Sequence, residues 1–301
     1  MTRDEMLEKA QVIRSRDRFG AMTQEELDAL PGTETVLKIP SGNSDVTVYE
    51  IRPEHQPDFP CPLIINLHGG GFLKGRSDRD HRYCSFLAEA LGAVVWDVDY
   101  SLAPEFPFPK AVYECYNILQ YAFENAAELG FDHGRIALAG HSAGGTLAAA
   151  SLILCGRNDD PMPCCALMEY FPTEQSRDPQ QKLAMLSPER QADPFWIRRV
   201  AVEAEYTDFY LRSEADLADP LCAPARASDE ELAKFPDSLI ISAGTDTLQA
   251  ETEAFAARLI GCGVTVTARR IPEAMHGFTT NRTEGWEKAL ENHRRFFSMY
   301  L

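Results

Sequence analysis

The chain has 301 residues, 45% of them hydrophobic and 25% charged, which are the proportions of a globular protein with enough apolar material for a large core. Its formal net charge of −17 repels phosphates and anionic membrane surfaces, so nucleic acid is excluded as an expected partner. Residues 1–10 are polar and no run reaches the roughly 18 apolar residues of a membrane helix, so we expect a cytoplasmic protein that does not bind membranes.

The first predicted elements are two charged, weakly amphipathic helices within residues 2–30, which Pro31 and Gly32 end. Two strand-like runs follow at 33–39 and 46–52, separated by the turn-forming residues 40–43. This pair predicts an antiparallel hairpin at the edge of a sheet.

From residue 63 onward, short apolar runs alternate with helical patterns. The predicted strands lie at 63–67, 93–98, 135–139, 164–171, 238–243 and 264–269. The predicted helices lie at about 80–91, 110–129, 143–156, 248–260 and 286–300. Apolar strands joined by helices indicate a mostly parallel sheet with helices on both faces, an α/β fold. Between Pro172 and Pro224 there is no strand pattern, only a helix at about 194–211, so we interpret this segment as an insertion over the sheet edge.

A strand running into Gly140–His141–Ser142–Ala143–Gly144 forms the pattern G-x-S-x-G, and a helix of small residues follows it. This strand–turn–helix context is typical of a nucleophile elbow, a turn so tight that its flanking positions require glycine. The turn places the serine oxygen at a helix N-terminus, where negative charge is stabilised. Ser142 is therefore the predicted nucleophile.

A second motif, the sequence His-Gly-Gly-Gly-Phe at residues 68–72, directly follows the strand at 63–67. Successive glycines allow several backbone N–H groups to point at one position, as an oxyanion hole requires. A phosphate-binding loop is the alternative. The motif, however, lacks the Lys-Ser/Thr ending of a P-loop and the spacing of a dinucleotide site.

An acid and a base follow the nucleophile in the order that α/β-hydrolases use. Asp246 comes after the strand at 238–243, and His276 comes after the strand pattern that continues to residue 271. Both are thus expected at the carboxyl edge of the sheet, where open α/β folds bind ligands. The sequence shows no cluster with metal-ligand spacing, so we expect neither a metal nor a cofactor.

These motifs, together with Asp-Tyr-Ser-Leu-Ala-Pro-Glu at 99–105 and His-Gly-Phe at 276–278, resemble the hormone-sensitive-lipase-like esterases, the acetyl-esterase or α/β-hydrolase fold-3 group. The resemblance covers roughly residues 60–300. It implies an α/β-hydrolase fold in a single domain over 1–301, and a Ser142–His276–Asp246 triad. Backbone N–H groups of Gly70, Gly71 and Ala143 are the implied oxyanion hole.

The resemblance also implies a cap over the site, here residues 1–32 and about 173–224. We expect the substrate pocket to be lined by two residues near the catalytic motifs and four aromatic residues of the inserted helix: Phe72, His141, Phe195, Trp196, Tyr206 and Phe209. The chain departs from the family pattern at three points. His141 replaces the usual Asp, Ser101 replaces Arg, and Thr247 with Gln249 stand where Pro and Arg are common.

The expected function is hydrolysis of small, short-acyl carboxylic esters through an acyl-enzyme. An amidase or arylformamidase with the same triad is the alternative, since the elbow sequence at 140–145 also occurs in arylformamidase-like proteins. A non-catalytic binding protein, like the plant gibberellin receptors that lack the catalytic His, is disfavoured because His276 is present. An acetylated sugar, a xenobiotic ester and a metabolite ester all remain open as substrates, as does the oligomeric state, a homodimer included.

Overall fold

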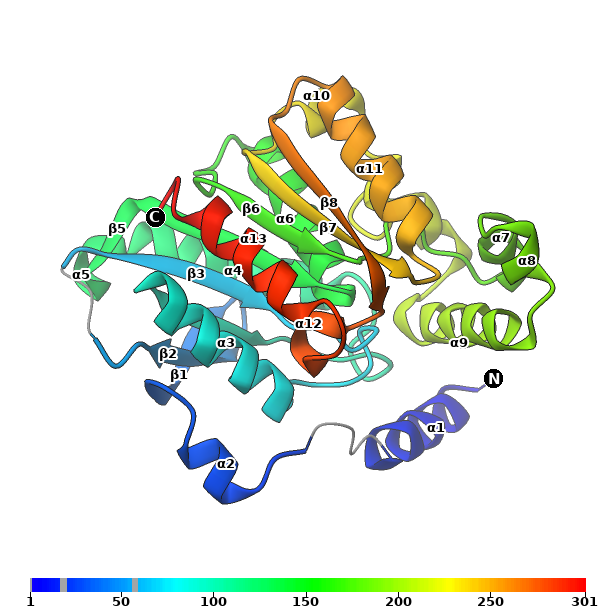
Figure 1. Ribbon diagram of the computed structural model, residues 1–301, viewed down its shortest axis with the longest axis horizontal. Helices are drawn as coiled ribbons and strands as arrows, with labels where there is room; N and C mark the ends of the chain where they lie inside the picture. Colours follow the sequence, from blue (N-terminus) through cyan, green and yellow to red (C-terminus); the bar gives the residue numbers. More distant parts are fainter. Residues whose placement is uncertain (1, 17–20, 56–58) are drawn as a thin grey trace.

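The computed structural model describes residues 2–16, 21–55 and 59–301. Within these residues the chain forms one eight-stranded sheet with helices packed on both sides (Figure 1). The strands are β1 (Thr33–Ser41), β2 (Ser44–Arg52), β3 (Cys61–Leu67), β4 (Val94–Asp99), β5 (Phe131–His141), β6 (Ala166–Glu169), β7 (Ser238–Thr245) and β8 (Val266–Met275). The helices are α1 (Arg3–Arg16), α2 (Gln24–Asp28), α3 (Asp78–Leu91), α4 (Lys110–Glu124), α5 (Ala126–Leu129), α6 (Ala143–Asn158), α7 (Pro179–Ala184), α8 (Pro188–Gln191), α9 (Pro194–Tyr210), α10 (Asp229–Leu232), α11 (Gln249–Gly261), α12 (Phe278–Asn281) and α13 (Trp286–Phe297), with 3₁₀ turns at Glu214–Ala218 and Pro224–Arg226.

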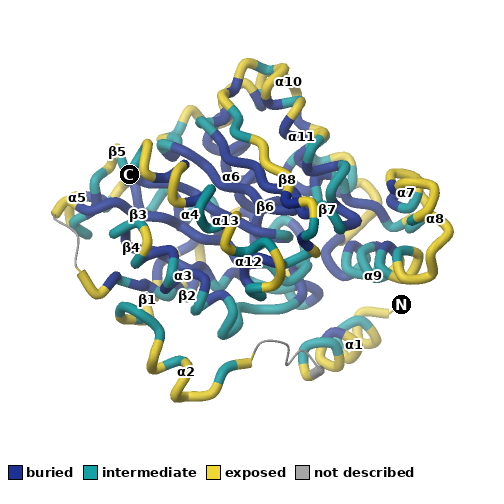
Figure 2. Tube along the Cα trace, in the orientation of Figure 1, coloured by how far each residue is buried: buried dark blue, intermediate teal, exposed yellow. Residues whose placement is uncertain are grey.

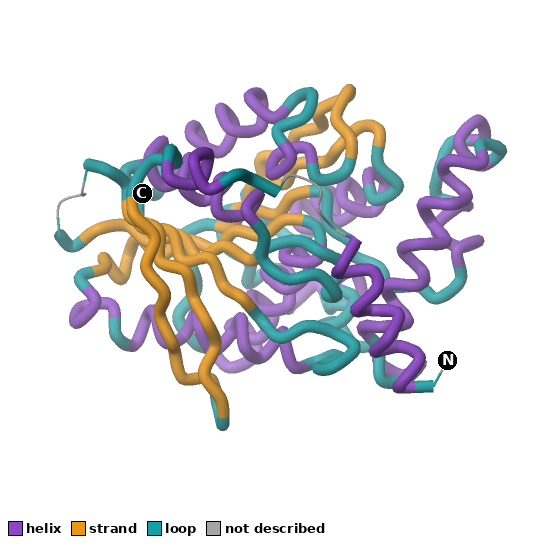
Figure 3. Tube along the Cα trace, turned by 90° about the horizontal axis from the view of Figure 1, so that it is seen from below, coloured by secondary structure: helices purple, strands orange, loops and turns teal. Residues whose placement is uncertain are grey.

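The strand order β1-β2-β4-β3-β5-β6-β7-β8 confirms the predicted mostly parallel sheet. In the order β4-β3-β5-β6-β7-β8, each strand pairs in parallel with the next. The pairs β1–β2 and β2–β4 are antiparallel. The hairpin expected from residues 33–52 therefore lies at the sheet edge. Figure 3 shows the strands fanning out between two layers of helices.

Successive strand residues point to opposite faces of the sheet, and each face has its own apolar cluster. Leu63 and Ile65 of β3 belong to the cluster under α4, α6 and α11, whereas Ile64 packs with α3 and α13. Because both faces are covered, β3 and β6 are buried along their whole length, and β3 is dark in Figure 2.

Two strands differ in length from their predictions. Strand β6 ends at Glu169 because Tyr170 has a φ of 33°, which leaves the extended conformation although the apolar run continues. Strand β8 runs on to Met275, beyond the predicted 269. It is an edge strand with exposed arginines, so its later residues lack the apolar pattern of a buried strand.

The predicted insertion between β6 and β7 contains α7, α8 and α9 and no strand among the described residues. Helix α1 lies beside α9 (Figure 1), where Lys9 pairs with Glu205. The Arg14 Nε of α1 donates to the carbonyl of Leu73, in the loop after β3, at 2.7 Å. Residues 1 and 17–20 of the expected N-terminal cap segment lie outside the described residues. None of the described helices is long and apolar enough to cross a membrane.

Candidate active site

The nucleophile candidate Ser142 sits on a strained turn between β5 and α6, with φ 54° and ψ −127°. Its backbone N–H donates to the Glu169 carbonyl at 3.0 Å, which fixes the turn against β6. The glycines on either side are required by space. A Cβ on Gly140 would lie 2.3 Å from the Gly144 oxygen, and one on Gly144 would lie 1.8 Å from the Leu67 oxygen.

We expect Gly144→Ala to lower the free energy of unfolding by about 3 kcal/mol or more, because the added methyl meets rigid backbone that cannot move aside. Urea unfolding midpoints measure the effect. Gly261→Ala is the matched control, since nothing lies within 4 Å of the position its Cβ would occupy. Equal midpoints for the two variants would contradict the steric requirement at the turn.

Three side chains from three sheet-edge loops form a continuous hydrogen-bond chain. The Ser142 Oγ lies 2.8 Å from His276 Nε2, and His276 Nδ1 lies 2.7 Å from Asp246 Oδ2. Burial raises the pKa of Asp246, but the charge of His276 and the hydrogen bond between the two residues lower it more, so the carboxyl has a pKa below its usual range. An ionised carboxylate there orients the imidazole with its Nε2 lone pair toward Ser142.

The glycine loop after β3 faces the same space. Gly70 and Gly71 have φ values of 126° and 62°, which side-chain-bearing residues rarely adopt. His68, at the start of the loop, stacks its ring on Tyr100 with centroids 4.2 Å apart and so supports the loop. Gly70, Gly71 and Ala143 line the cavity that contains Ser142 and His276.

That cavity measures about 240 Å³ and lies between the sheet edge and the insertion. The sheet edge contributes Ser142, His276 and the glycine loop. The insertion contributes one face of α9: Arg199, Val202, Glu203 and Tyr206. Their spacing of three and four residues places them along one side of the helix.

Residues 64–280 match the model of a family described as "alpha/beta hydrolase fold". The chain belongs to this family. Among its relatives, an arylesterase of Saccharolobus solfataricus is 33% identical over 72% of this chain and 68% of its own length. The carboxylic ester hydrolase LipN of Mycobacterium tuberculosis is 30% identical over 89% and 70%. A Pyrobaculum calidifontis esterase structure superimposes with a TM-score of 0.84 at 27% identity, covering 96% of this chain and 93% of the esterase. These relatives confirm the hormone-sensitive-lipase-like branch expected from the motifs.

In this α/β-hydrolase, three of the six expected pocket residues line the cavity and three do not. Phe72, His141 and Tyr206 line it, and Tyr206 covers Gly71 so closely that a Cβ there would lie 2.2 Å from its ring. The expectation for the other three residues was wrong, because none of them lines the cavity: Phe195, Trp196 and Phe209.

The displaced aromatics have other structural roles. Phe195 is 48% exposed and packs edge-on against Trp196, which also stacks under the Arg190 guanidinium. Phe209 is 1% exposed and belongs to the main apolar core. Phe195 and Trp196 thus pack within the insertion, whereas Phe209 anchors α9 in the core, and none of the three lines the cavity.

His141, which replaces the usual Asp, is buried beside Ser142 and pairs with Asp80. Its Nε2 lies 3.2 Å from Asp80 Oδ1, while Asp80 Oδ2 accepts hydrogen bonds from the N–H and hydroxyl of Ser77 at the start of α3. Burial raises the pKa of Asp80, but its bonds to His141 and Ser77 hold it well below the usual range. The sequence placed Asp80 only at the start of a helix, and nothing in the pattern indicated its partner.

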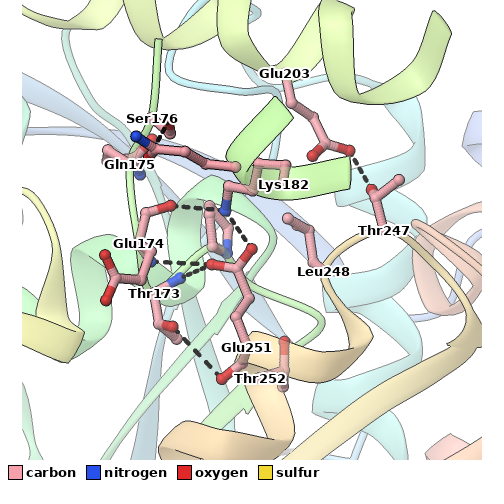
Figure 4. Close-up of polar contacts among 12 residues, drawn as sticks. Thr173, Glu174, Gln175, Ser176, Lys182, Glu203, Thr247, Leu248, Glu251 and Thr252 are labelled. Carbon is pink, nitrogen blue, oxygen red and sulfur yellow. Dashed lines mark hydrogen bonds and ion pairs between the residues drawn. The ribbon is translucent and has the colours of Figure 1, made fainter. Parts of the chain in front are cut away.

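No sequence pattern indicates a second buried pair, the ion pair between Lys182 and Glu251 (Figure 4). The Lys182 Nζ also donates to the Glu174 carbonyl at 2.7 Å, and Glu251 accepts from the N–H groups of Thr173 and Glu174. The pair thus fastens the start of the insertion to α11. It joins residues 69 positions apart, and no short-range pattern could connect them.

One group of potential metal ligands occurs among the described residues, away from this cavity. Glu54, His55 and Glu89 bring ligand atoms within 4.8 Å of one another at the protein surface. Glu54 and His55 are exposed, and clusters of exposed acidic groups commonly form without an ion. We assign them no role.

Proposed function

We propose that the protein is a serine carboxylesterase that cleaves small, short-acyl esters in two steps through an acyl-enzyme. Membership of a family of esterases supports the activity. The observation that carries the mechanism is the unbroken chain from Ser142 Oγ through His276 to Asp246, at 2.8 and 2.7 Å.

In the first step His276 Nε2 accepts the proton of Ser142 as the serine oxygen attacks the ester carbonyl carbon. The resulting oxyanion accepts hydrogen bonds from the N–H groups of Gly70, Gly71 and Ala143. His276 then protonates the leaving alcohol. Water repeats the sequence on the acyl-enzyme and releases the carboxylic acid, so the triad returns to its starting state.

We further propose that the cap comprises residues 1–32 and about 173–224 and has two parts with different roles. The insertion supplies cavity wall through α9. The described part of α1 supplies no cavity-lining residue and instead supports α9 through the Lys9–Glu205 pair.

Turnover of p-nitrophenyl acetate, measured beside acyl p-nitroanilides and N-formylkynurenine, tests the activity. We expect rapid ester hydrolysis with little amide cleavage. A preference for the amide or formamide would replace the esterase by the amidase alternative. No turnover of any of them, with intact folding and ligand binding, would establish a binding protein.

Chain-length preference follows from the size of the cavity. Each added methylene contributes at most about 0.8 kcal/mol while it is buried, and the gain turns into steric loss where the cavity ends. We therefore expect the highest kcat/KM on p-nitrophenyl esters with acyl chains of roughly two to six carbons. Rates that still rise at ten carbons would indicate an open site.

Matched variants sharpen this chain-length test. Val202→Phe adds bulk to the cavity wall and should shorten the preferred chain. Trp196→Ala makes a large change in side-chain volume outside the cavity and should leave the preferred chain length unchanged.

A further inference from the structure

The hydrogen-bond chain of the triad does not end at Asp246 but continues into the insertion. The Thr247 Oγ lies 3.3 Å from Asp246 Oδ1, and it also hydrogen-bonds Oε1 of Glu203 on α9. Figure 4 shows the Glu203 side chain extending from α9 to Thr247. Five residues thus form one line: Glu203, Thr247, Asp246, His276 and Ser142.

The Thr247 hydroxyl carries a single proton and has two carboxyl oxygens as competing acceptors. The alternative donor to Asp246 Oδ1 is the N–H of Leu248, also at 3.3 Å. The Thr247 hydroxyl can therefore donate to the Glu203 carboxyl or to the Asp246 carboxyl, but not to both at once.

Glu203 is the member of this line whose surroundings oppose its charged form. Its Oε2 is buried and has no hydrogen-bond partner among the described residues. Burial raises the pKa of the Glu203 carboxyl above its usual range, and the Thr247 hydrogen bond and the Lys182 charge offset only part of that rise. The charged groups around it include Lys182 of α7, which pairs with Glu251, and the neighbouring residues Asp246 and His276. Arg199, one turn earlier on α9, lines the same cavity.

We propose that Glu203 and Thr247 are positioning residues for the triad, through which the insertion adjusts the state of Asp246. When Glu203 is protonated it donates to the Thr247 oxygen, and the Thr247 proton then points to Asp246. When Glu203 is ionised the Thr247 proton points to Glu203, and a second negative charge lies near the triad. This inference rests on the proposed Ser142–His276–Asp246 mechanism.

The sign of the effect on activity follows from that second charge. A negative charge near the triad stabilises protonated His276, the form that cannot accept the Ser142 proton. Ionised Glu203 therefore moves the acid-side loss of kcat/KM toward higher pH. Because burial moves the protonation of Glu203 toward neutral pH, we expect the loss in the wild type to be broader than a single protonation.

The first test is the pH profile of kcat/KM on p-nitrophenyl acetate for Glu203→Gln. This change removes the charge and keeps the shape, so we expect the acid-side midpoint to fall by about half a pH unit and the limb to sharpen. Glu189→Gln, an exposed position on α8 of the same insertion, makes the same change in net charge and should match the wild type. Coincident profiles for all three proteins would overturn the proposal.

The second test removes the intermediate hydroxyl and does not depend on the folding of the Glu203 variant. Thr247→Val keeps the shape of threonine but removes the hydrogen bond that stabilises ionised Glu203, so the acid-side midpoint of kcat/KM should fall as it does for Glu203→Gln. Thr247→Ser keeps the hydroxyl and should match the wild type. A purely structural role for Thr247 predicts a lower melting temperature with the acid limb unmoved, and a wild-type pH profile in Thr247→Val would overturn the proposal.

Failure of this inference is distinguishable from failure of the proposed mechanism. If Ser142→Ala is inactive while the Glu203 and Thr247 variants behave as wild type, only the extension into the insertion is wrong. If Ser142→Ala stays active, the triad mechanism itself is wrong.

Discussion

Replacing Ser142 by alanine is expected to lower kcat on p-nitrophenyl acetate by about 10⁴–10⁶-fold, the scale of losing a triad nucleophile. In the proposed mechanism Ser142 Oγ is the atom that His276 activates, and the two atoms lie 2.8 Å apart. The fold should survive, because alanine fits the elbow turn as serine does and the N–H bond to the Glu169 carbonyl remains. A fluorophosphonate should label the wild type once, at Ser142, as read by peptide mass spectrometry.

Ser151→Ala is the matched control for this change. Ser151 lies on α6, the same helix that Ser142 precedes, and its buried hydroxyl only donates to the Leu147 carbonyl. That variant should keep full kcat and full labelling. Label at another serine, or an alanine variant at 142 with more than a tenth of wild-type activity, would refute the assignment.

Asp246→Asn should lower kcat by about 10⁴-fold, the next largest effect, while KM changes little. An amide at this position can donate a proton to His276 Nδ1, where the carboxylate Oδ2 now accepts one at 2.7 Å. The imidazole would then carry its proton on Nε2 and could not accept one from Ser142. The measurement is steady-state kcat at neutral pH.

The control for this acid is Asp237→Asn, at the opposite end of β7, where the carboxylate accepts from the Tyr300 hydroxyl. It should lower stability slightly and leave kcat unchanged. An Asp246→Asn enzyme within tenfold of the wild type would mean that another group orients His276.

The motifs of the candidate site could be recognised in the sequence because each depends on a short stretch of backbone. The glycines around Ser142 and the loop at 68–72 are required by local sterics, which leave a fixed pattern in the sequence. Asp246 and His276 each follow a recognisable strand. Parallel strands bring such positions to one edge whatever the loops between them do.

The wall of the cavity could not be predicted in the same way. Helix α9 carries apolar residues around most of its circumference, so its sequence does not indicate which face meets the cavity. The size of Phe195 and Trp196 favours them as pocket residues, yet the face that lines the cavity contains Arg199 and Glu203. The Asp80–His141 and Lys182–Glu251 pairs could not be predicted from the sequence either, because each depends on the packing of segments far apart in the chain.

The insertion between β6 and β7 has a consequence for how such an enzyme evolves. The part of the insertion that lines the cavity is separate from the strands that position Ser142, Asp246 and His276. Substitutions in the insertion can therefore alter substrate selectivity without changing those three residues. The hydrogen bond that Thr247 donates to Glu203 limits that freedom. In this lineage positions 203 and 247 should change together, and a graft of a foreign insertion should succeed best when residue 247 is exchanged with it.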